Sequence, residues 1–440
     1  MRRGGGSSVP SFDAGRVPVE VIELSSPATQ GLSPGQFEVI GRKTSYRLAQ
    51  RPGGFVVLKY IRPVVKRKDT EAISPRPVPA DVVEGCRADV SFIAGVLIEK
   101  FAYDFPLHRQ YQRLVDCGIR VSRPCLKRMT RQAVELLEPI YQAQFESIRA
   151  GHVVAMDETP IKVGPIGRSR AKVGYFWPVY GGQEEVCFPV FPSSAVENFR
   201  EALGGGRALD AVLWTEGHAA YQSYATKVGL AHAQSWSLCR RVFAEAETDN
   251  PEGVREALRQ IAALYAIEDE IRERELTGDA KRLHRLTHSK PRVDAFFEWI
   301  RCQYERREVS SIGLFVQALE SVHRRRPGLE IFLTDPDVPI ETQSLEGAAG
   351  TIPARQQSWN FCCTELSAKH AGIAQSLIVT CRLHAVELHM YLADVLQRVG
   401  QHPASRVEQL TPRLWKQYFA DKPLRSDLRA LGGRSCGVPS

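Results

Sequence analysis

Long apolar runs, paired cysteines and nucleotide-loop motifs are missing from this 440-residue sequence. No apolar run approaches the roughly 18–20 residues that cross a bilayer, and none follows the basic start MRRGGG, so we expect neither a membrane span nor a signal peptide. The ten cysteines form no C-x-x-C pair, which predicts reduced thiols in a cytoplasmic protein and gives a zinc site no support. The segment GGGR at 204–207 lacks the Gly-Lys-Ser/Thr of a phosphate loop, so ATP use is not expected.

Basic residues are present in excess, and they are unevenly distributed. Lys plus Arg number 58 against 50 Asp plus Glu, which gives a net charge of +8. Residues 41–70 contain nine basic residues and a single acid. Such a cluster is typical of a surface that faces phosphates, although a solvated basic face produces the same pattern.

The apolar pattern changes period several times along the chain, which predicts an α/β protein with a helical insertion. Gly, Ser and Pro dominate the start, strands alternate with helices from residue 150, and strand signals vanish between about 245 and 326. The predicted segments are a disordered tail at 1–35, a β-rich basic segment and linker at 36–85, a helical region at 86–149, the first part of an α/β core at 150–245, the helical insertion at 246–330, the second part of the core with one closing helix at 331–400, and a polar tail at 401–440.

Two consecutive helices in the 86–149 region carry many cations. One is predicted over 106–118, and the next begins after Ser122, a candidate N-cap. A Gly-containing turn between two basic helices is typical of a helix-turn-helix DNA reader, although ordinary packed helix pairs look the same. The candidate DNA contacts are Arg109, Arg113, Arg120, Arg123, Lys127, Arg128 and Arg131.

Three acids lie at the ends of apolar segments. Asp157 ends the strand-like run in GHVVAMDETPIKVG, Glu216 follows DAVLW, and Glu346 lies where the insertion returns to the core. Carboxylates at neighbouring strand ends converge on one sheet edge, where they can bind hard cations such as Mg²⁺. The alternative is that these acids cap helices or turns. His152 is a further candidate, either as a general base or as a structural residue.

Several motifs, in order and at compatible distances, resemble transposases of the insertion sequence 66 family between about Phe37 and Val399. MDETPIKV resembles that family's first acid motif and VLWTEGHAAY its second. IETQSLEGAAGTIPARQQSWNF is similar to the third block, and SLIVTCRLHAVELHMYLADVLQRV to the closing helix. SWSLCRRVF is similar to a segment in which the family keeps two arginines, here Arg240 and Arg241.

The resemblance implies a ribonuclease-H-like core that cuts and joins DNA strands at element ends with two Mg²⁺ (or Mn²⁺) ions. Asp157, Glu216 and Glu346 would be the catalytic acids and the metal ligands. Double-stranded DNA of the element ends and the target would be the partner, bound by a homo-oligomer without membrane involvement. Accessory proteins encoded by the same element and association with the nucleoid are also implied.

The sequence departs from the family pattern at several positions. Glu216 replaces an Asp, and its extra methylene moves the carboxylate by about 1.5 Å, whereas catalytic groups tolerate about 0.5 Å. Thr342–Gln343 replaces an Asn pair, Gly347 an Arg and Leu238 a His, and the Cys-rich zinc element is missing near residues 60–80. Three hypotheses stay open: an active transposase, a catalytically inactive DNA-binding relative, and a non-transposing metal nuclease.

Overall fold

The computed structural model describes residues 11–13, 15–51, 53–70, 73–75, 81–157, 159–163, 172–191, 193, 198, 203, 211–215, 219–305, 313–341 and 365–428. The chain forms two compact units: unit 1 comprises residues 1–143 and 373–440, and unit 2 comprises residues 144–372. Among the described residues, no helix is long and apolar enough to cross a membrane.

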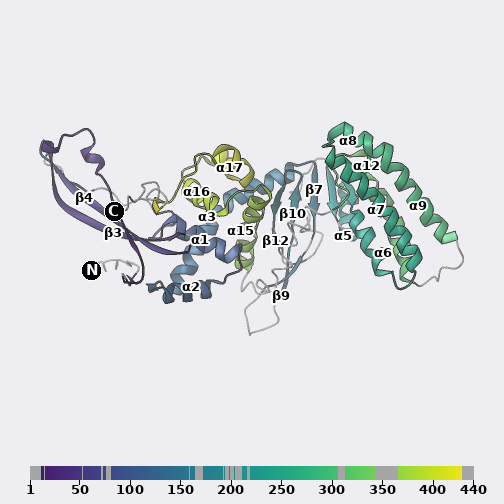
Figure 1. The fold of residues 1–440 in the computed structure, drawn as a ribbon, viewed down its shortest axis with the longest axis horizontal. Coiled ribbons are helices and arrows are strands. Elements are labelled where there is room, and N and C mark those ends of the chain that lie inside the picture. Colours follow the sequence, from purple (N-terminus) through teal and green to yellow (C-terminus); the bar gives the residue numbers. More distant parts are fainter. Residues whose placement is uncertain are drawn as a thin grey trace, which may run out of the picture. The chain divides into compact units, whose positions relative to one another are not determined.

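Unit 1 contains a long antiparallel ribbon made by β3 (Phe37–Arg51) and β4 (Gly54–Arg67). Figure 1 shows this ribbon extending away from the helices of the same unit. Its inner half is buried, because Ala49, Val56 and Leu58 pack with Leu428. The short strands around it are β1 (Ser11–Phe12), β2 (Val19–Glu23), β5 (Ile73–Pro75) and β6 (Ile119–Arg120), with the single turns η1 (Pro27–Thr29) and η2 (Pro34–Gln36).

Residues 19–23 lie within the segment that composition predicts to be disordered, but they form β2. This strand pairs in parallel with β4 over five residues, from Val19↔Val57 to Glu23↔Ile61. The prediction was wrong here because a distant strand supplies the hydrogen bonds, and local composition does not report a distant partner.

The helices of unit 1 begin and end at residues with recognisable caps. Asp89 accepts a hydrogen bond from the Ser91 N–H at 2.8 Å, and the Ser122 hydroxyl accepts one from the Cys125 N–H at 3.3 Å, as predicted for Ser122. The helices are α1 (Val90–Phe101), α2 (Leu107–Asp116), α3 (Arg123–Ala150), α15 (Glu365–Leu383), α16 (Leu388–Arg398), η4 (Ala404–Leu410) and α17 (Pro412–Tyr418), with α3 and α15 crossing the unit boundaries.

The predicted single closing helix is two helices, and the predicted polar tail is folded. Ala385 has a positive φ of 51°, which ends the first helix, and the Glu387 carboxylate then caps α16. Trp415 in the tail is fully buried, and its indole N–H donates to Asp394 at 3.0 Å. One large aromatic residue therefore anchors a segment whose average composition is polar.

A five-stranded mixed sheet forms the centre of unit 2. β7 (Val153–Met156) lies in the middle; β10 (Val179–Gly181) and β11 (Glu185–Cys187) follow antiparallel on one side, and β13 (Val212–Thr215) and β14 (Ala231–Gln234) follow parallel on the other. A second sheet contains β8 (Thr159–Val163), β9 (Lys172–Phe176) and β12 (Val190–Phe191). The predicted strand at 174–182 is thus divided between two sheets, with Trp177 and Pro178 at the break.

The described residues between Pro251 and Arg324 are mainly helical, as the apolar periodicity of this segment predicts. The helices that follow β14 pack on the face of the central sheet that carries Val153, Ala155 and Trp214, and they add Phe243 and Phe296 to one continuous core. Figure 1 shows them grouped beyond β7. The helices of unit 2 include α5 (Ala219–Val228), which precedes β14, and then α6 (Trp236–Glu245), α7 (Pro251–Glu273), α8 (Gly278–His284), the π-helical turn η3 (Arg285–Ser289), α9 (Lys290–Glu305), α10 (Leu314–Arg324), α11 (Arg326–Leu329) and α12 (Ile331–Thr334). The chain is therefore a mixed α/β protein.

Candidate functional site

Asp157 lies at the carboxyl end of the central strand. It directly follows β7, is half-buried, and donates its backbone N–H to the Pro178 carbonyl at 3.3 Å. Met156, the last residue of β7, is paired with Thr215 of β13, and Thr215 is paired with Gln234 of β14. Three parallel strands therefore end together at the sheet edge where Asp157 lies. Of the three predicted acids only Asp157 is described, and Glu216 and Glu346 lie outside the described residues.

The predicted DNA contacts of unit 1 are mostly exposed. Arg113 is the exception, because it is paired with Glu99 and its guanidinium lies over the rings of Phe55 and Phe105. The exposed members of the set are Arg109, Arg120, Arg123, Lys127, Arg128 and Arg131. Positions 123, 127 and 131 of α3 are spaced four residues apart, which places them on one helix face.

The two arginines of unit 2 that the resemblance singles out are also exposed. Arg240 and Arg241 lie on α6, and the Arg240 guanidinium is 5.7 Å from the centre of the Tyr265 ring. Leu238, which replaces a family histidine, is buried on the same helix. The substitution thus exchanges a polar position for an apolar contact.

His152 lies at the opposite end of β7 from Asp157. The two positions are five residues apart, which is about 16 Å along an extended strand, so His152 is too distant to act as a base for Asp157. Its Nε2 is 2.7 Å from Asp335, and the potential ligand atoms of His152, Asp335 and Asp337 lie within 4.8 Å of one another. Asp335 also accepts the Asp337 N–H at 3.0 Å, so hydrogen bonds within the fold already account for the arrangement.

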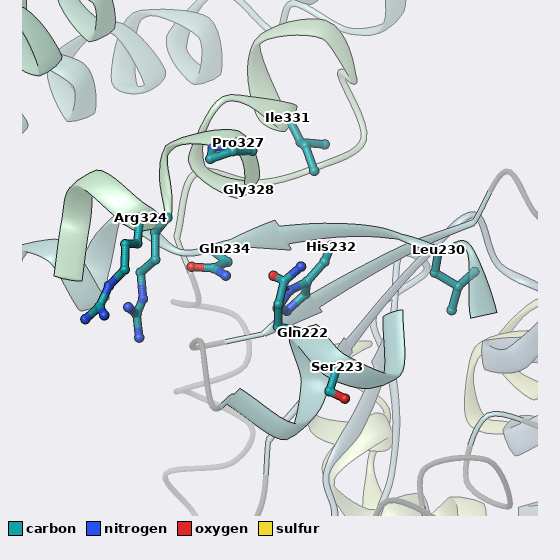
Figure 2. Close-up of a pocket in the computed structure, with 10 residues that line it drawn as sticks. Gln222, Ser223, Leu230, His232, Gln234, Arg324, Pro327, Gly328 and Ile331 are labelled. Carbon is teal, nitrogen blue, oxygen red and sulfur yellow. The ribbon is translucent and has the colours of Figure 1, made fainter. Parts of the chain in front are cut away.

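A pocket of about 780 Å³ lies beside β14, the strand whose last residue, Gln234, is at the sheet edge where Asp157 lies. Residues of α5, β14 and the α10–α11 turn line this pocket. Figure 2 shows Gln234, His232 and Gln222 in this pocket, with Arg324 at one end. Sequence reasoning missed these residues, because 231–234 was not assigned to a strand. The signal was present in the alternation of Ala231, His232, Ala233 and Gln234, which places His232 and Gln234 on one strand face.

His232 forms a neutral hydrogen-bonded chain across the pocket wall. Its Nδ1 is 2.6 Å from the side-chain amide oxygen of Gln222, and its Nε2 is 2.8 Å from the Thr215 hydroxyl. Burial, and secondarily the charge of Arg325, lowers the pKa of His232 from 6.5 to about 4. The neutral imidazole therefore donates to Gln222 and accepts from Thr215.

The stability of the protein is expected to fall when the pH drops below the ordinary histidine pKa. Because the folded pKa is depressed, the unfolded chain binds the proton first, so the contribution of His232 is complete above pH 6.5 and decreases as the pH falls toward 4. The free energy of unfolding should decrease by about 2 kcal/mol between pH 7.5 and pH 5.0. Urea unfolding at both values tests this, with His232→Gln as the comparison. An equal pH dependence in the variant would assign the effect to other groups.

Comparisons with known proteins identify the family. Residues 85–370 match the family described as Transposase IS66 family, and residues 376–413 match the IS66 C-terminal element. The uncharacterized protein y4hP of Sinorhizobium fredii (strain NBRC 101917 / NGR234) is 25% identical over 91% of this chain and 76% of its own length. The uncharacterized protein y4jD of the same organism is 26% identical over 90% of this chain and 80% of its own length. The chain therefore belongs to the IS66 family of transposases.

Proposed function

We propose that this protein is a DNA transposase that cleaves and transfers strands at the ends of an insertion element, using divalent metal ions. The observation that carries the proposal is the register of two parallel strands in unit 2. Met156 and Thr215 are paired, and they directly precede Asp157 and Glu216. Family membership supports the same reaction.

We further propose that the unit 2 sheet is a ribonuclease-H-like core. Support comes from the strand order β11-β10-β7-β13-β14, in which β10 alone runs antiparallel to β7, and β11, β13 and β14 run in the same direction as β7. The helices that follow β14 would be the predicted insertion, since they pack together on one face of the central sheet. In this proposal the insertion supports the catalytic edge by filling the face beneath it.

The chemistry of Asp157 suits a hard cation. Carboxylate oxygens are the ligands that Mg²⁺ and Mn²⁺ prefer, and two such ions, when bound, activate an attacking oxygen and stabilise the departing one. Asp157 would supply one carboxylate from a position that β7 and the Pro178 hydrogen bond hold in place. Glu216 and Glu346 are proposed to complete the site.

Unit 1 is proposed to bind double-stranded DNA through α2 and α3, in a helix-turn-helix arrangement. The turn between them contains Gly118 with a φ of 83°, a conformation that favours glycine. The exposed cations at positions 123, 127 and 131 follow one face of α3, which gives a row of positive charge against a phosphate backbone. Arg113 is left out of this contact set, because its partner Glu99 is largely buried and two aromatic rings lie against its guanidinium. Arg131 stays in the set, because its ion pair with Glu135 is exposed on both sides.

The test is a strand-cleavage assay on the DNA that flanks the gene, with Mg²⁺ or Mn²⁺, comparing the native chain with Glu216→Asp. Native cleavage supports the proposal, and cleavage by the Asp variant alone identifies a transposase impaired by one methylene. The matched control is Glu245→Asp at an exposed position of α6, which should behave as the native chain. Salt-sensitive DNA binding without cleavage in any variant would favour the inactive DNA-binding relative. The absence of both would overturn the proposal.

A further inference from the structure

We propose that the pocket between α5, β14 and the α10–α11 turn binds one unpaired nucleotide of a DNA strand, with the base edge on Gln234 and the phosphate on Arg324. This inference rests on the proposed function, because it assumes that DNA reaches the sheet edge of unit 2. It adds a site that recognises an exposed base, separate from the carboxylates and from the exposed cations of unit 1.

Gln234 is the residue that indicates a missing ligand. The residue is only 8% exposed, and its side-chain amide oxygen is buried without a hydrogen-bond partner in the part of the chain that the structure describes. A buried polar group without a partner costs about 1–3 kcal/mol, so native structures seldom retain one without a reason. An amide offers one donor and one acceptor side by side, which is the complement of a base edge such as that of adenine.

The hydrogen bonds that hold the pocket wall next to Gln234 do not involve the amide of Gln234. Gln222, the other amide of the pocket, is already bonded to His232, and His232 is bonded in turn to Thr215. Since His232 is neutral, this wall offers no charge to a ligand. Gln234 is therefore the residue that can hydrogen-bond to a base edge, and Leu230, Pro327 and Ile331 provide apolar surface for the face of the base.

Arg324 supplies the charge that a phosphate requires. It is exposed and lines the pocket. Arg325, which donates to the Ser321 hydroxyl at 3.0 Å, adds a second positive charge beside it. Figure 2 shows Arg324 at one end of the pocket and Gln234 between it and the His232–Gln222 pair, an order that matches phosphate and base in one nucleotide.

The α11 segment approaches β14 closely enough to form the pocket wall only because residue 328 is glycine. A Cβ at Gly328 would lie 2.7 Å from the His232 carbonyl oxygen and 3.0 Å from the Gln234 side chain. The wall is thus built against the two residues that define the pocket. A solvent gap at a loose helix end would not require so close an approach.

The position of the pocket connects it to the candidate catalytic edge. Gln234 is in register with Thr215, and Thr215 with Met156, so Gln234 is two strands away from the strand that carries Asp157. Two strand spacings are about 10 Å, which corresponds to roughly three nucleotides of a B-form strand at 3.4 Å each. One DNA strand can therefore occupy both places.

The experiment measures the affinity of the full chain for three labelled duplexes that differ at one position, by fluorescence anisotropy. One duplex is blunt, the second carries a single unpaired adenine nucleotide at its 3′ end, and the third carries an abasic residue there. The native chain should bind the adenine duplex about thirtyfold more tightly than the abasic one, the middle of the range for one bidentate base contact. Gln234→Leu should abolish this difference and leave the affinity for the blunt duplex unchanged.

Two further variants separate the parts of the pocket. Arg324→Gln should weaken binding of the adenine and abasic duplexes alike and reduce the salt dependence by about one charge. Gln317→Leu, at an exposed position of α10, is the matched control and should retain the native preference. Thermal unfolding of Gln234→Leu should match or exceed that of the native chain, because the substitution removes a buried amide oxygen without a partner.

The outcomes distinguish failure of the pocket from failure of the proposed function. Equal affinity for adenine and abasic duplexes, with normal binding of blunt DNA, would overturn the pocket assignment alone. No binding of any duplex would overturn both proposals. Titration with free deoxyadenosine monophosphate tests the other source of the same chemistry. Tight binding of the free nucleotide that depends on Gln234, without preference for the unpaired DNA nucleotide, would overturn the assignment to a DNA strand.

Discussion

Replacement of Arg285 by methionine is expected to lower the free energy of unfolding by about 3–5 kcal/mol. Arg285 is fully buried in the π-helical turn and donates two hydrogen bonds, at 2.8 and 2.7 Å, to the carboxylate of Glu268. Its Nη1 also donates to the carbonyls of Phe332, Asp335 and Val338. Methionine would leave a buried carboxylate and three carbonyls without their donor, and this accounts for the large effect.

The matched control is Arg301→Met on α9. Arg301 also makes a close ion pair, with Glu298, but both side chains are more than half exposed, at 58% and 57%. Exposed pairs contribute about 0–1 kcal/mol, so this variant should unfold almost as the native chain does. Urea unfolding of both variants checks the prediction, and equal midpoints would contradict it.

A double replacement tests the stated cause. Arg285→Met combined with Glu268→Leu removes both charges, and buried pairs replaced by apolar residues are often neutral in stability. The double variant should therefore recover much of what the single variant loses. If the double variant lost as much stability as the two single variants together, the cause would be the three carbonyls and the packing rather than the isolated carboxylate.

Replacement of Asp157 by asparagine is expected to reduce metal-dependent strand cleavage by about 10³-fold. Loss of one carboxylate ligand removes several kcal/mol of charge stabilisation, and each 1.36 kcal/mol corresponds to tenfold in rate. The affinity for DNA should stay the same, because the exposed cations of unit 1 are untouched. Stability should change little, since asparagine has nearly the same shape as aspartate and the backbone hydrogen bond to the Pro178 carbonyl is kept.

The control for Asp157 is Asp335→Asn, which removes the carboxylate that faces His152 at the far end of β7. This variant should keep cleavage within about threefold of native, because His152 lies about 16 Å along the strand from Asp157. Cleavage under Mg²⁺ and Mn²⁺ and binding by anisotropy are measured for both variants. Full activity of Asp157→Asn, or loss of activity only in Asp335→Asn, would move the candidate metal centre to the other end of the sheet.

Sequence patterns predicted the helices and strands of unit 2 more reliably than they predicted how the strands pair. The helices that follow β14 were predicted because Phe243, Ile261 and Phe296 recur on apolar faces, a periodicity that local sequence carries. The division of 174–182 between two sheets was missed, because strand pairing joins residues that are distant in sequence. The folded tail was missed for a related reason, since Trp415 gains its partners from α16.

In the candidate site, too, some residues stand out in the local sequence and others only in the folded structure. Asp157 was singled out because an acid that ends an apolar strand is locally unusual, whereas Gln234 and Arg324 look ordinary in their own segments. Their importance follows from burial without a partner and from the close approach at Gly328. These are properties of neighbours that only folding brings together.

The sequence by itself determined the family, the end of β7 before Asp157 and the helices that follow β14, because the chain carries motif order and periodicity locally. Only the tertiary structure decided that β7, β13 and β14 end at one edge, that His152 belongs to the opposite end, and that a pocket adjoins β14. The physical reason is that register, burial and charge pairing depend on contacts between distant segments, and such contacts have no local signature in the sequence.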